Sequence, residues 1–205
     1  MKTILHLCAD IGSDSHVYKQ NGYNVIKVGK DIGVESFSYN GEVFGIIANP
    51  VCTEFSFAKM KHNNGNGDHE AGLFLVNHCL RIINECNPAW WYIENPATGR
   101  LKNFLGKPDF IYEPYEFGDG WTKKTALWGK FNKPEKTHTW ETCPKIEGLY
   151  TRPNRQKPSL AFMHKSHKKF IPSFDDFIVD DDMGFRSLCS QGFAKAFFDK
   201  NSEEN

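Results

Sequence analysis

IIANPVCTEFS, residues 46–56, is the stretch from which the architecture of this chain can be inferred. Its apolar run ends abruptly at Asn49-Pro50, and Cys52 follows at once. The pattern returns later, where residues 90–93, WWYI, run into Glu94-Asn95-Pro96. Each run has the length of a buried parallel strand, and we expect each proline to end its strand. Open α/β sheets place their sites at the carboxyl ends of strands. The sequence therefore predicts that the Cys52 thiol and the Glu94 carboxyl group lie side by side over one crevice.

The bulk properties limit what the protein can be. Its 205 residues fit one domain with a sizeable core, and its formal net charge of zero gives no overall signature of a polyanion-binding protein. Any nucleic-acid surface must come from local charge. No two of the six cysteines have CxxC spacing, which argues against a zinc ribbon or a disulfide framework and is typical of thiols in a reducing cytosol. No apolar segment has membrane-spanning length, so we expect a cytoplasmic protein with no membrane partner, and favour a monomer.

The first half of the chain alternates between strand-like and helix-like segments. Strands are expected over residues 3–9, 23–28, 44–48 and 90–93, and helices over residues 15–21 and 70–87. The longer helix is expected to pack through a stripe of Leu73, Val76, Leu80 and Ile83. Residues 59–68, just before it, are predicted to form a polar loop rich in glycine and asparagine. This alternation predicts a doubly wound α/β sheet.

The second half departs from this alternation. Residues 110–117 and 125–131 are predicted to be two strands around the turn Gly118-Asp119-Gly120, which adds an antiparallel edge hairpin to a mixed, mostly parallel sheet. Residues 132–169 are proline-rich, basic and weakly periodic, and are interpreted as an insertion or a reduced recognition segment. An acidic run at residues 180–182 precedes a helix over residues 191–200. Residues 1–205 are thus predicted to be a single domain, with the combination of strands that is typical of S-adenosylmethionine-dependent methyltransferases.

Four segments carry a resemblance to one family. They are the loop Asn49-Pro50-Val51-Cys52, the motif Glu94-Asn95-Pro96, residues 123–129 (KKTALWG) and residues 185–197 (FRSLCSQGFAKAF). In this order they resemble motifs of the DNA cytosine-5 methyltransferases, in particular the short enzymes of phages and mobile elements. The resemblance implies a Rossmann-like methyltransferase fold, DNA as the partner, and a place in the cytoplasm of a bacterial host. It also implies that a C-terminal helix over residues 185–201 packs back on the cofactor end.

The resemblance implies a role for each catalytic residue. Cys52 would attack C6 of a cytosine flipped out of DNA, and Glu94 would hydrogen-bond N3 and the exocyclic amine. C5 would then take the methyl group of S-adenosylmethionine, and loss of the C5 proton would release the cysteine. Lys123 and Lys124 stand where the family has arginine. They would contact a phosphate or the pyrimidine carbonyl, or else form a solvated pair after the turn.

The expected cofactor site lies at the carboxyl ends of the first strands. Gly12, in the turn after the first strand, lets the backbone approach a ligand closely. Asp31, just past the second strand, is either an acceptor for a ribose hydroxyl or an adenine amine, or an ordinary turn aspartate. The residues expected to bind S-adenosylmethionine are Ala9, Asp10, Gly12, Ser13, Asp31, Asn49, Pro50 and Ser190. No metal site is expected, because His138, His164 and His167 lack the spacing of metal ligands.

Departures from the family pattern leave alternatives open. Val51 replaces the second proline of the nucleophile loop, and the first turn keeps only Asp10 and Gly12 of the family's Phe-x-Gly-x-Gly. One alternative is a catalytically impaired, DNA-binding relative. Another is a cytosine C5-modifying enzyme that uses a free nucleotide or an altered one-carbon donor.

Two further predictions concern contacts with DNA. The best candidate for a backbone-binding patch is the basic run that contains Lys157, Lys165, Lys168 and Lys169, although such runs are also found as solvated surface. Trp121 and Trp128 are predicted to be better stacking platforms for bases than Trp90 and Trp91, which are expected to be sheet residues.

Overall fold

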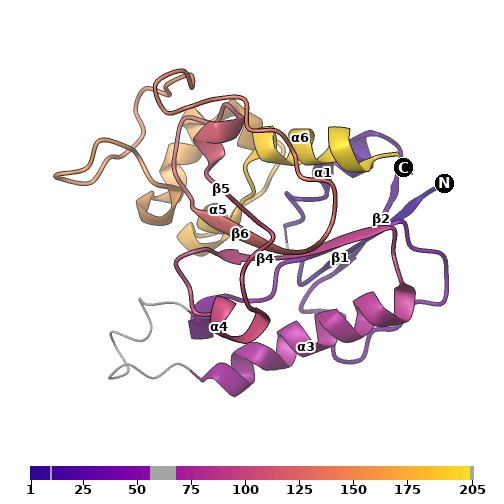
Figure 1. The fold of residues 1–205 in the computed structure, drawn as a ribbon. Helices are drawn as coiled ribbons and strands as arrows, with labels where there is room; N and C mark the ends of the chain where they lie inside the picture. The colour runs from indigo at the N-terminus through magenta and orange to yellow at the C-terminus, as the bar shows by residue number, and fades with distance from the viewer. Residues whose placement is uncertain (10, 56–67, 204–205) are drawn as a thin grey trace.

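A computed structural model describes residues 1–9, 11–55 and 68–203, and its centre is a six-stranded sheet in the order β2-β1-β3-β4-β6-β5 (Figure 1). The strands are β1 (Thr3–Leu7), β2 (Asn24–Val28), β3 (Gly45–Ala48), β4 (Trp90–Pro96), β5 (Phe110–Tyr112) and β6 (Thr125–Lys130). The first four are parallel, β6 runs antiparallel to β4, and β5 runs antiparallel to β6. The predicted mixed sheet with an antiparallel edge hairpin is confirmed. The expected loop over residues 59–68 lies, but for Asp68, outside the described residues.

Helices cover both faces of this sheet (Figure 1). α3 (His69–Cys86) and α4 (Lys102–Leu105) lie on one face, and α1 (His16–Gln20) and α6 (Gln191–Asn201) lie on the other. Successive residues of a strand point to opposite faces. In β4, Ile93 accordingly joins the core cluster that contains α3, whereas Tyr92 joins the cluster that contains α1 and α6. Both faces are apolar because both are buried, as the unbroken apolar runs of the sequence predicted.

Helix α3 begins at a side-chain cap and turns a slightly different face to the sheet than expected. The Asp68 carboxylate accepts a hydrogen bond from the Ala71 backbone N–H at 3.0 Å, which satisfies one of the free donors of the first turn. The fully buried positions are Gly72, Val76, Cys79, Ile82 and Ile83. Leu73 and Leu80 of the expected stripe lie at its margin and are only partly buried. The buried face of α3 includes the small residues Gly72 and Cys79, which the expected stripe lacks, and small residues allow a helix to approach its neighbours closely.

Strand β4 is longer than predicted, because β6 pairs with its last residues. Glu94 pairs with Leu127, and Pro96 pairs with Thr125. Pro96 is the last residue of the strand, where the missing N–H disturbs the ladder least. Glu94 is therefore held within a strand and not in a loop, which fixes the direction of its side chain. The first strand of the hairpin, β5, is shorter than expected, because Pro114–Phe117 forms a 3-10 turn.

The C-terminal helix closes the second face through aromatic contacts. Phe193 of α6 stacks on Tyr112 of β5, with ring centroids 3.9 Å apart, and Phe197 packs edge-on against Tyr92 at 4.9 Å. The single helix expected over residues 185–201 is wrong, because residues 188–190 are not helical and separate α6 from a further short helix, α5 (Asp182–Ser187). Its N-cap is Asp181, whose carboxylate accepts from the Gly184 N–H at 2.7 Å. The acidic run at residues 180–182 is thus partly a helix start.

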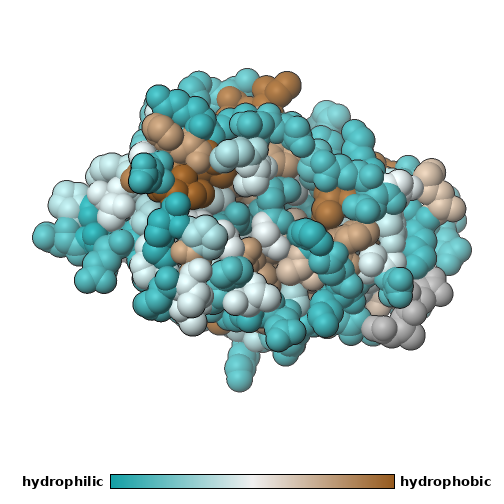
Figure 2. All heavy atoms as spheres, turned by 90° about the horizontal axis from the view of Figure 1, so that it is seen from above, coloured by the Kyte–Doolittle hydropathy of each residue, from teal (hydrophilic) through white to brown (hydrophobic). Residues whose placement is uncertain are grey.

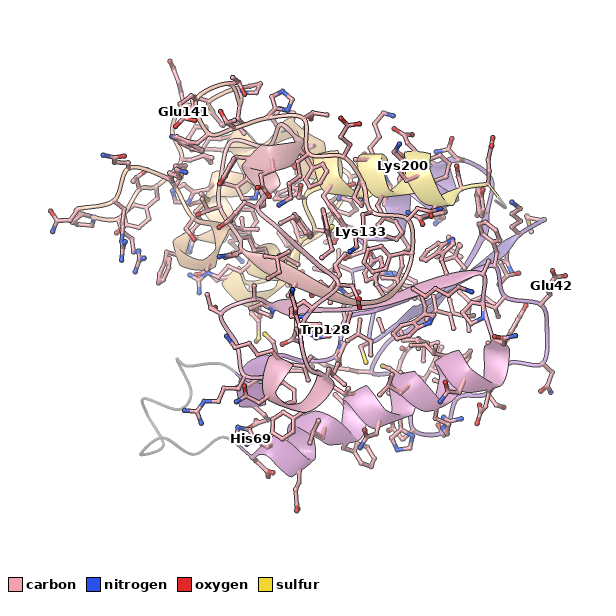
Figure 3. The ribbon with its side chains drawn as sticks, viewed as in Figure 1. Glu42, His69, Trp128, Lys133, Glu141 and Lys200 are labelled. Atoms are coloured by element: carbon pink, nitrogen blue, oxygen red, sulfur yellow. The ribbon has the colours of Figure 1, made fainter. Side chains whose placement is uncertain are left out.

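A third, smaller core cluster lies under the segment that follows β6. Its buried members are Trp121, Leu160, Met163, Ile171, Phe174, Phe177, Phe185 and Leu188. Between residues 132 and 169 the chain has short 3-10 helices and no strand or α-helix, and an orange loop from this part projects at the left of Figure 1. The prediction of Trp121 and Trp128 as stacking platforms is wrong, since both are buried. Figure 3 shows Trp128 directed from the sheet toward the α4 side. Within the described part of the chain, no helix is long and apolar enough to cross a membrane.

Candidate active site

Cys52 and Glu94 come from neighbouring strands at the same edge of the sheet. β3 and β4 pair in parallel, with Ala48 opposite Ile93, so the loop that follows β3 emerges beside the last residues of β4, which include Glu94. Cys52 lies in the loop after β3 and is half-buried. The loop is tied to β4, because the Asn95 side-chain amide donates to the Pro50 carbonyl at 3.0 Å. Burial and the nearby Glu94 carboxylate both raise the pKa of the Cys52 thiol.

An asparagine joins two carboxyl groups in this site. The Asn49 Nδ2 group lies 3.3 Å from Glu94 Oε2 and 3.2 Å from Asp14 Oδ1, and donates to both. Asn49 comes from the end of β3, Glu94 from β4, and Asp14 from the turn between β1 and α1. One side-chain amide therefore fixes three segments of the chain relative to one another.

His6, in β1, supports this asparagine from behind. Its Nε2 lies 2.6 Å from Asn49 Oδ1, and its Nδ1 lies 2.8 Å from Ser15 Oγ. Because the Asn49 oxygen can only accept, His6 must carry a proton on Nε2. Burial lowers the pKa of His6, although Asp14 and Asn49 oppose that shift. In the neutral ring Nδ1 can only accept, so the one proton of the Ser15 hydroxyl is shared between His6 Nδ1 and the Gly12 carbonyl, which lies 3.2 Å away.

The surroundings of Glu94 raise the pKa of its carboxyl group above the ordinary value. Burial raises the pKa of its carboxyl group, and the Asp14 carboxylate adds to this shift. Lys123 and the Asn49 hydrogen bond act in the opposite direction. Lys123 also opposes the raised pKa of Cys52. One ammonium group thus stabilises the charged forms of both Cys52 and Glu94.

The structure separates the two lysines that the sequence treated as a pair. Lys123 is half-buried, and its Nζ donates to the carbonyl oxygens of Ser187 and Leu188, each at 3.0 Å. Lys124 is exposed, and its charge acts on Glu113 instead of Glu94. Neighbouring residues at the start of a strand point to opposite sides, so only Lys123 reaches the crevice.

The residues expected to bind the cofactor lie at the carboxyl ends of β1, β2 and β3. Ala9 is buried, and its N–H donates to the Val28 carbonyl of β2 at 3.2 Å. Gly12 has a φ of +85°, in the region that favours glycine, and Asp31 is an exposed turn residue. Pro50 is held by Asn95, as described above. Asp10 lies outside the described residues.

Ser13 and Ser190 are already engaged in contacts within the protein. The Ser13 hydroxyl accepts from the Cys189 N–H at 2.9 Å, and the Gln191 side chain donates to the Ser13 carbonyl at 3.2 Å. Ser190 caps α6, accepting from the Phe193 N–H at 3.1 Å, and donates to Asp119 at 2.5 Å. The start of α6 therefore packs directly against the turn after β1, and this junction is closed.

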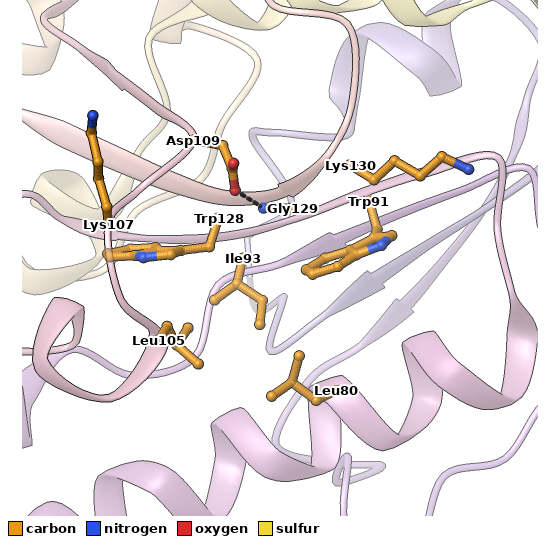
Figure 4. A pocket seen from close by; sticks show the side chains of 9 residues that line it. All are labelled: Leu80, Trp91, Ile93, Leu105, Lys107, Asp109, Trp128, Gly129 and Lys130. Carbon is orange, nitrogen blue, oxygen red and sulfur yellow. Dashed lines mark hydrogen bonds between the residues drawn. The ribbon is translucent and has the colours of Figure 1, made fainter.

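One hollow in the described part of the chain lies away from Cys52 and Glu94. It is a shallow pocket of about 270 Å³ between β4, β6, α3 and α4 (Figure 4). Its apolar wall includes Trp91, Ile93 and Trp128, and neither Cys52 nor Glu94 lines it. It lies on the opposite face of β4 from Tyr92, so it is not part of the site. Among the described residues, no group of three or more His, Cys, Asp or Glu side chains could hold a metal ion.

The sequence interpretation missed Asp14, His6 and Gln191. Asp14 could have been found by the argument that singled out Cys52, because it also follows a buried strand and a small-residue turn. His6 gave no signal, since it lies inside an apolar run and reads as a core position. Gln191 gave no signal either, because its hydrogen bond to the Ser13 carbonyl depends on how α6 packs against the turn after β1.

Comparison with known proteins gives one clear relative. The chain is 31% identical over 115 residues to a protein of Frog virus 3 (isolate Goorha) called a probable DNA (cytosine-5)-methyltransferase. This match covers 49% of the chain and 53% of the relative, so the chain spans about half the length of that protein. It confirms the resemblance to DNA cytosine-5 methyltransferases that the motifs indicated. No family model matches.

A comparison of folds also gives a match. It is a crystal structure of a putative DNA modification methyltransferase encoded within a prophage, from E. coli, with a TM-score of 0.47 and 14% sequence identity. The match covers 76% of this chain and 56% of the other.

Proposed function

We propose that this protein transfers a methyl group from S-adenosylmethionine to C5 of cytosine in DNA, through a covalent bond between Cys52 and C6. The observation that carries the proposal is that Cys52 and Glu94 meet at the ends of two adjoining strands, with Lys123 acting on the pKa of both. A thiol, a carboxyl group that holds a proton and a cation are the groups that conjugate addition to a pyrimidine needs.

The chemistry assigns one task to each of these groups. The Cys52 thiolate forms a bond to C6, and the electron pair of the C5–C6 bond moves toward C5 and the ring. Glu94 donates its proton to N3 as the electron density on the ring rises. S-adenosylmethionine supplies the methyl group that C5 acquires. Loss of the C5 proton to a base then restores the C5–C6 double bond, the Cys52 sulfur leaves with the electron pair of the C6–S bond, and N3 returns its proton to Glu94.

The surrounding residues prepare the two reacting groups. Asn49 and Asp14 hold the Glu94 carboxyl group in one orientation, and the charge of Asp14 favours its protonated form. Lys123 offsets the burial that disfavours the Cys52 thiolate. A proton on Glu94 and a negative charge on Cys52 are mutually compatible, because the neutral carboxyl group no longer repels the thiolate.

The donor set at the strand ends fits the cofactor on its exposed side. Gly12 has a positive φ and the Lys27 side chain packs against it, and the exposed Asp31 carboxylate suits a ribose diol. Ala9, Asn49 and Pro50 belong to the same rim. Ser13 and Ser190 would act indirectly, because their hydroxyl groups join α6 to the turn. We therefore propose that the cofactor binds beside the contact between α6 and the turn after β1, and not between these two segments.

The test is a covalent trap combined with product analysis. Duplex DNA that contains 5-fluorocytosine should form an adduct with the protein in the presence of S-adenosylmethionine, because fluorine cannot leave as a proton. Cys52→Ala should form none, and digestion of ordinary duplex DNA should give 5-methyldeoxycytidine. An adduct with Cys52→Ala would overturn the assigned nucleophile. Activity on deoxycytidine monophosphate but not on DNA would favour the free-nucleotide alternative, and cofactor binding without transfer would favour an impaired relative.

A further inference from the structure

Positive charge is concentrated in one part of this chain. Residues 148–174 contain six Lys and Arg side chains and no Asp or Glu. They are Arg152, Arg155, Lys157, Lys165, Lys168 and Lys169. Because the whole chain has a formal net charge of zero, the rest of the protein carries a matching excess of acid. The left end of the molecule in Figure 2, toward which the orange loops of Figure 1 project, has a hydrophilic surface.

The second half of this basic segment faces the protein's own acidic run. Lys165 donates from its backbone N–H to the Asp182 carboxylate at 2.8 Å and from its Nζ to the Asp180 carbonyl. Lys168 Nζ donates to the Asp175 carbonyl at 3.2 Å. Five aspartates lie between residues 175 and 182, so they offset the field of these lysines. Lys165 and Lys168, which the sequence favoured as DNA contacts, are therefore less suitable for binding DNA than the cations in the first half of the segment.

The first half of the segment forms a rigid exposed turn. The Arg155 N–H donates to the Arg152 carbonyl at 3.1 Å, with Pro153 and Asn154 as the two central residues. Asn154 has a φ of +61°. Proline at the first central position and a positive φ at the second are the features of a type II turn. Proline restricts the backbone in the unbound state, so presenting the two arginines costs little further ordering.

This turn is anchored to the rim of the active site. The Pro158 carbonyl accepts from the Thr122 N–H at 2.9 Å and from its hydroxyl at 3.0 Å, and the Leu160 N–H donates to the Thr122 carbonyl at 3.0 Å. Thr122 directly precedes Lys123, which acts on Cys52 and Glu94. Three hydrogen bonds thus tie the chain that follows the turn to Thr122, the residue before Lys123.

Aromatic side chains hold the flanking cations in place. The Arg152 guanidinium lies 3.6 Å from the centre of the Phe162 ring, and Lys157 Nζ lies 4.5 Å from that of Tyr115. Arg155 is exposed at the end of the turn, and its side chain has no hydrogen bond or ion pair with the described residues. Its planar fork of donors remains available for an anion or a base edge.

We propose that the turn Arg152–Arg155 is the element that grips DNA beside the reacting cytosine, with Arg155 as its contact residue. This proposal rests on the proposed function, which makes DNA the substrate. It replaces Lys165, Lys168 and Lys169 as the leading contact surface, because Lys165 and Lys168 contact the acidic run and Arg155 does not.

The experiment compares single and triple substitutions in a binding assay without methyl donor. Fluorescence anisotropy with a labelled duplex should show about tenfold weaker binding for Arg155→Ala, with the slope of log K against log salt reduced by about one. The variant in which Lys165, Lys168 and Lys169 are all alanine should lose less affinity than Arg155→Ala alone. Lys200→Ala is the matched control, because Lys200 lies exposed on α6, away from this end (Figure 3), and should bind as the parent protein does.

The outcomes separate this inference from the proposed function. Binding of Arg155→Ala within about twofold of the parent, or a larger loss in the triple variant, would overturn the role of the turn and leave methyl transfer by the parent protein untouched. A parent protein that transfers no methyl group and binds no duplex would overturn both. Melting temperatures of all variants, compared with that of the parent, exclude loss of folding as the cause.

Discussion

At the level of single residues, one cation, Lys123, influences the pKa of both Cys52 and Glu94. Lys123 lowers the pKa of Cys52 and of Glu94, whereas burial raises both. Lys124, next in the chain, is exposed and does not take part. Of these two neighbouring lysines, Lys123 acts on the pKa of Cys52 and Glu94, whereas Lys124 is solvated. The direction of each side chain accounts for the difference.

We predict that the reactivity of Cys52 reports this balance. Its alkylation by iodoacetamide should rise with pH, with a midpoint above that of an ordinary cysteine, because burial and Glu94 disfavour the thiolate. Glu94→Gln removes the negative charge that Glu94 carries when it is ionised, so the midpoint should move down. Lys123→Met removes a positive charge, so the midpoint should move up. Mass spectrometry of the Cys52 peptide measures the rate separately from the other five cysteines.

Lys124→Met is the control for this prediction. It removes the same charge one residue away, and the midpoint of Cys52 should stay where it is. Equal shifts for Lys123→Met and Lys124→Met would show that Cys52 senses only the overall charge of the protein, and would contradict the placement of Lys123 at the site.

At the scale of elements, the contact between α6 and the turn before β6 is unusually close. A Cβ atom on Gly192 would lie 2.1 Å from the Phe117 carbonyl oxygen, which belongs to the backbone and cannot rotate away. The Gly192 N–H also donates to Asp119 at 3.1 Å, beside the cap residue Ser190. Glycine is required here so that the helix can approach the backbone, and the first turn of α6 is fixed as a result.

We predict that Gly192→Ala destabilises the protein although alanine is the better helix former. The clash should cost about 1–3 kcal/mol, the usual range for overpacking. For a domain of this size, that corresponds to a fall in Tm of about 2–4 °C for each kcal/mol. Thermal unfolding followed by circular dichroism measures it. Lys195→Ala, at an exposed position of the same helix, should change Tm little, and a Gly192→Ala protein as stable as the parent would contradict the close packing.

The same packing changes how the C-terminal helix can be used in experiments. Removing the residues after Arg186 would delete Phe193 and Phe197, which cover Tyr112, Trp90 and Tyr92. Such a truncation would expose the core of one face of the sheet, and we expect it to unfold the protein. Cofactor binding is better tested by Asp31→Ala, whose exposed side chain has no such structural burden.

At the scale of the whole molecule, the sheet and its helices use most of the chain. Residues 132–169 form short 3-10 helices and loops, and they share a small core with Trp121 and with residues 171–188. This segment contains no helix or strand of the kind that enters the major groove in base-reading modules. Its exposed cations are suited to phosphate contacts, which position a protein on DNA without reading sequence.

We predict weak sequence discrimination by this protein. Bisulfite sequencing of DNA from cells that express it should show methylation in a short or degenerate context. The Cys52→Ala protein, expressed to the same level, provides the background. A strictly defined target of about six base pairs or more would contradict the prediction, and would require a reading module that these residues do not form.

The pattern of apolar runs in the sequence is sufficient to predict the layout of the sheet and the edge at which the candidate site lies. Apolar runs that end in Asn-Pro specify buried strands, and a chain that alternates strand and helix pairs those strands in parallel, so Cys52 and Glu94 emerge at one edge for reasons that are local. Only the tertiary structure decided the length of β4, the burial of Trp121 and Trp128, the bridge from His6 through Asn49 to Asp14, and the choice of Lys123 over Lys124. These features depend on side-chain direction and on contacts between residues far apart in the chain. A short pattern carries no record of them, because the partner that satisfies each buried polar group is fixed only when the strands and helices have packed.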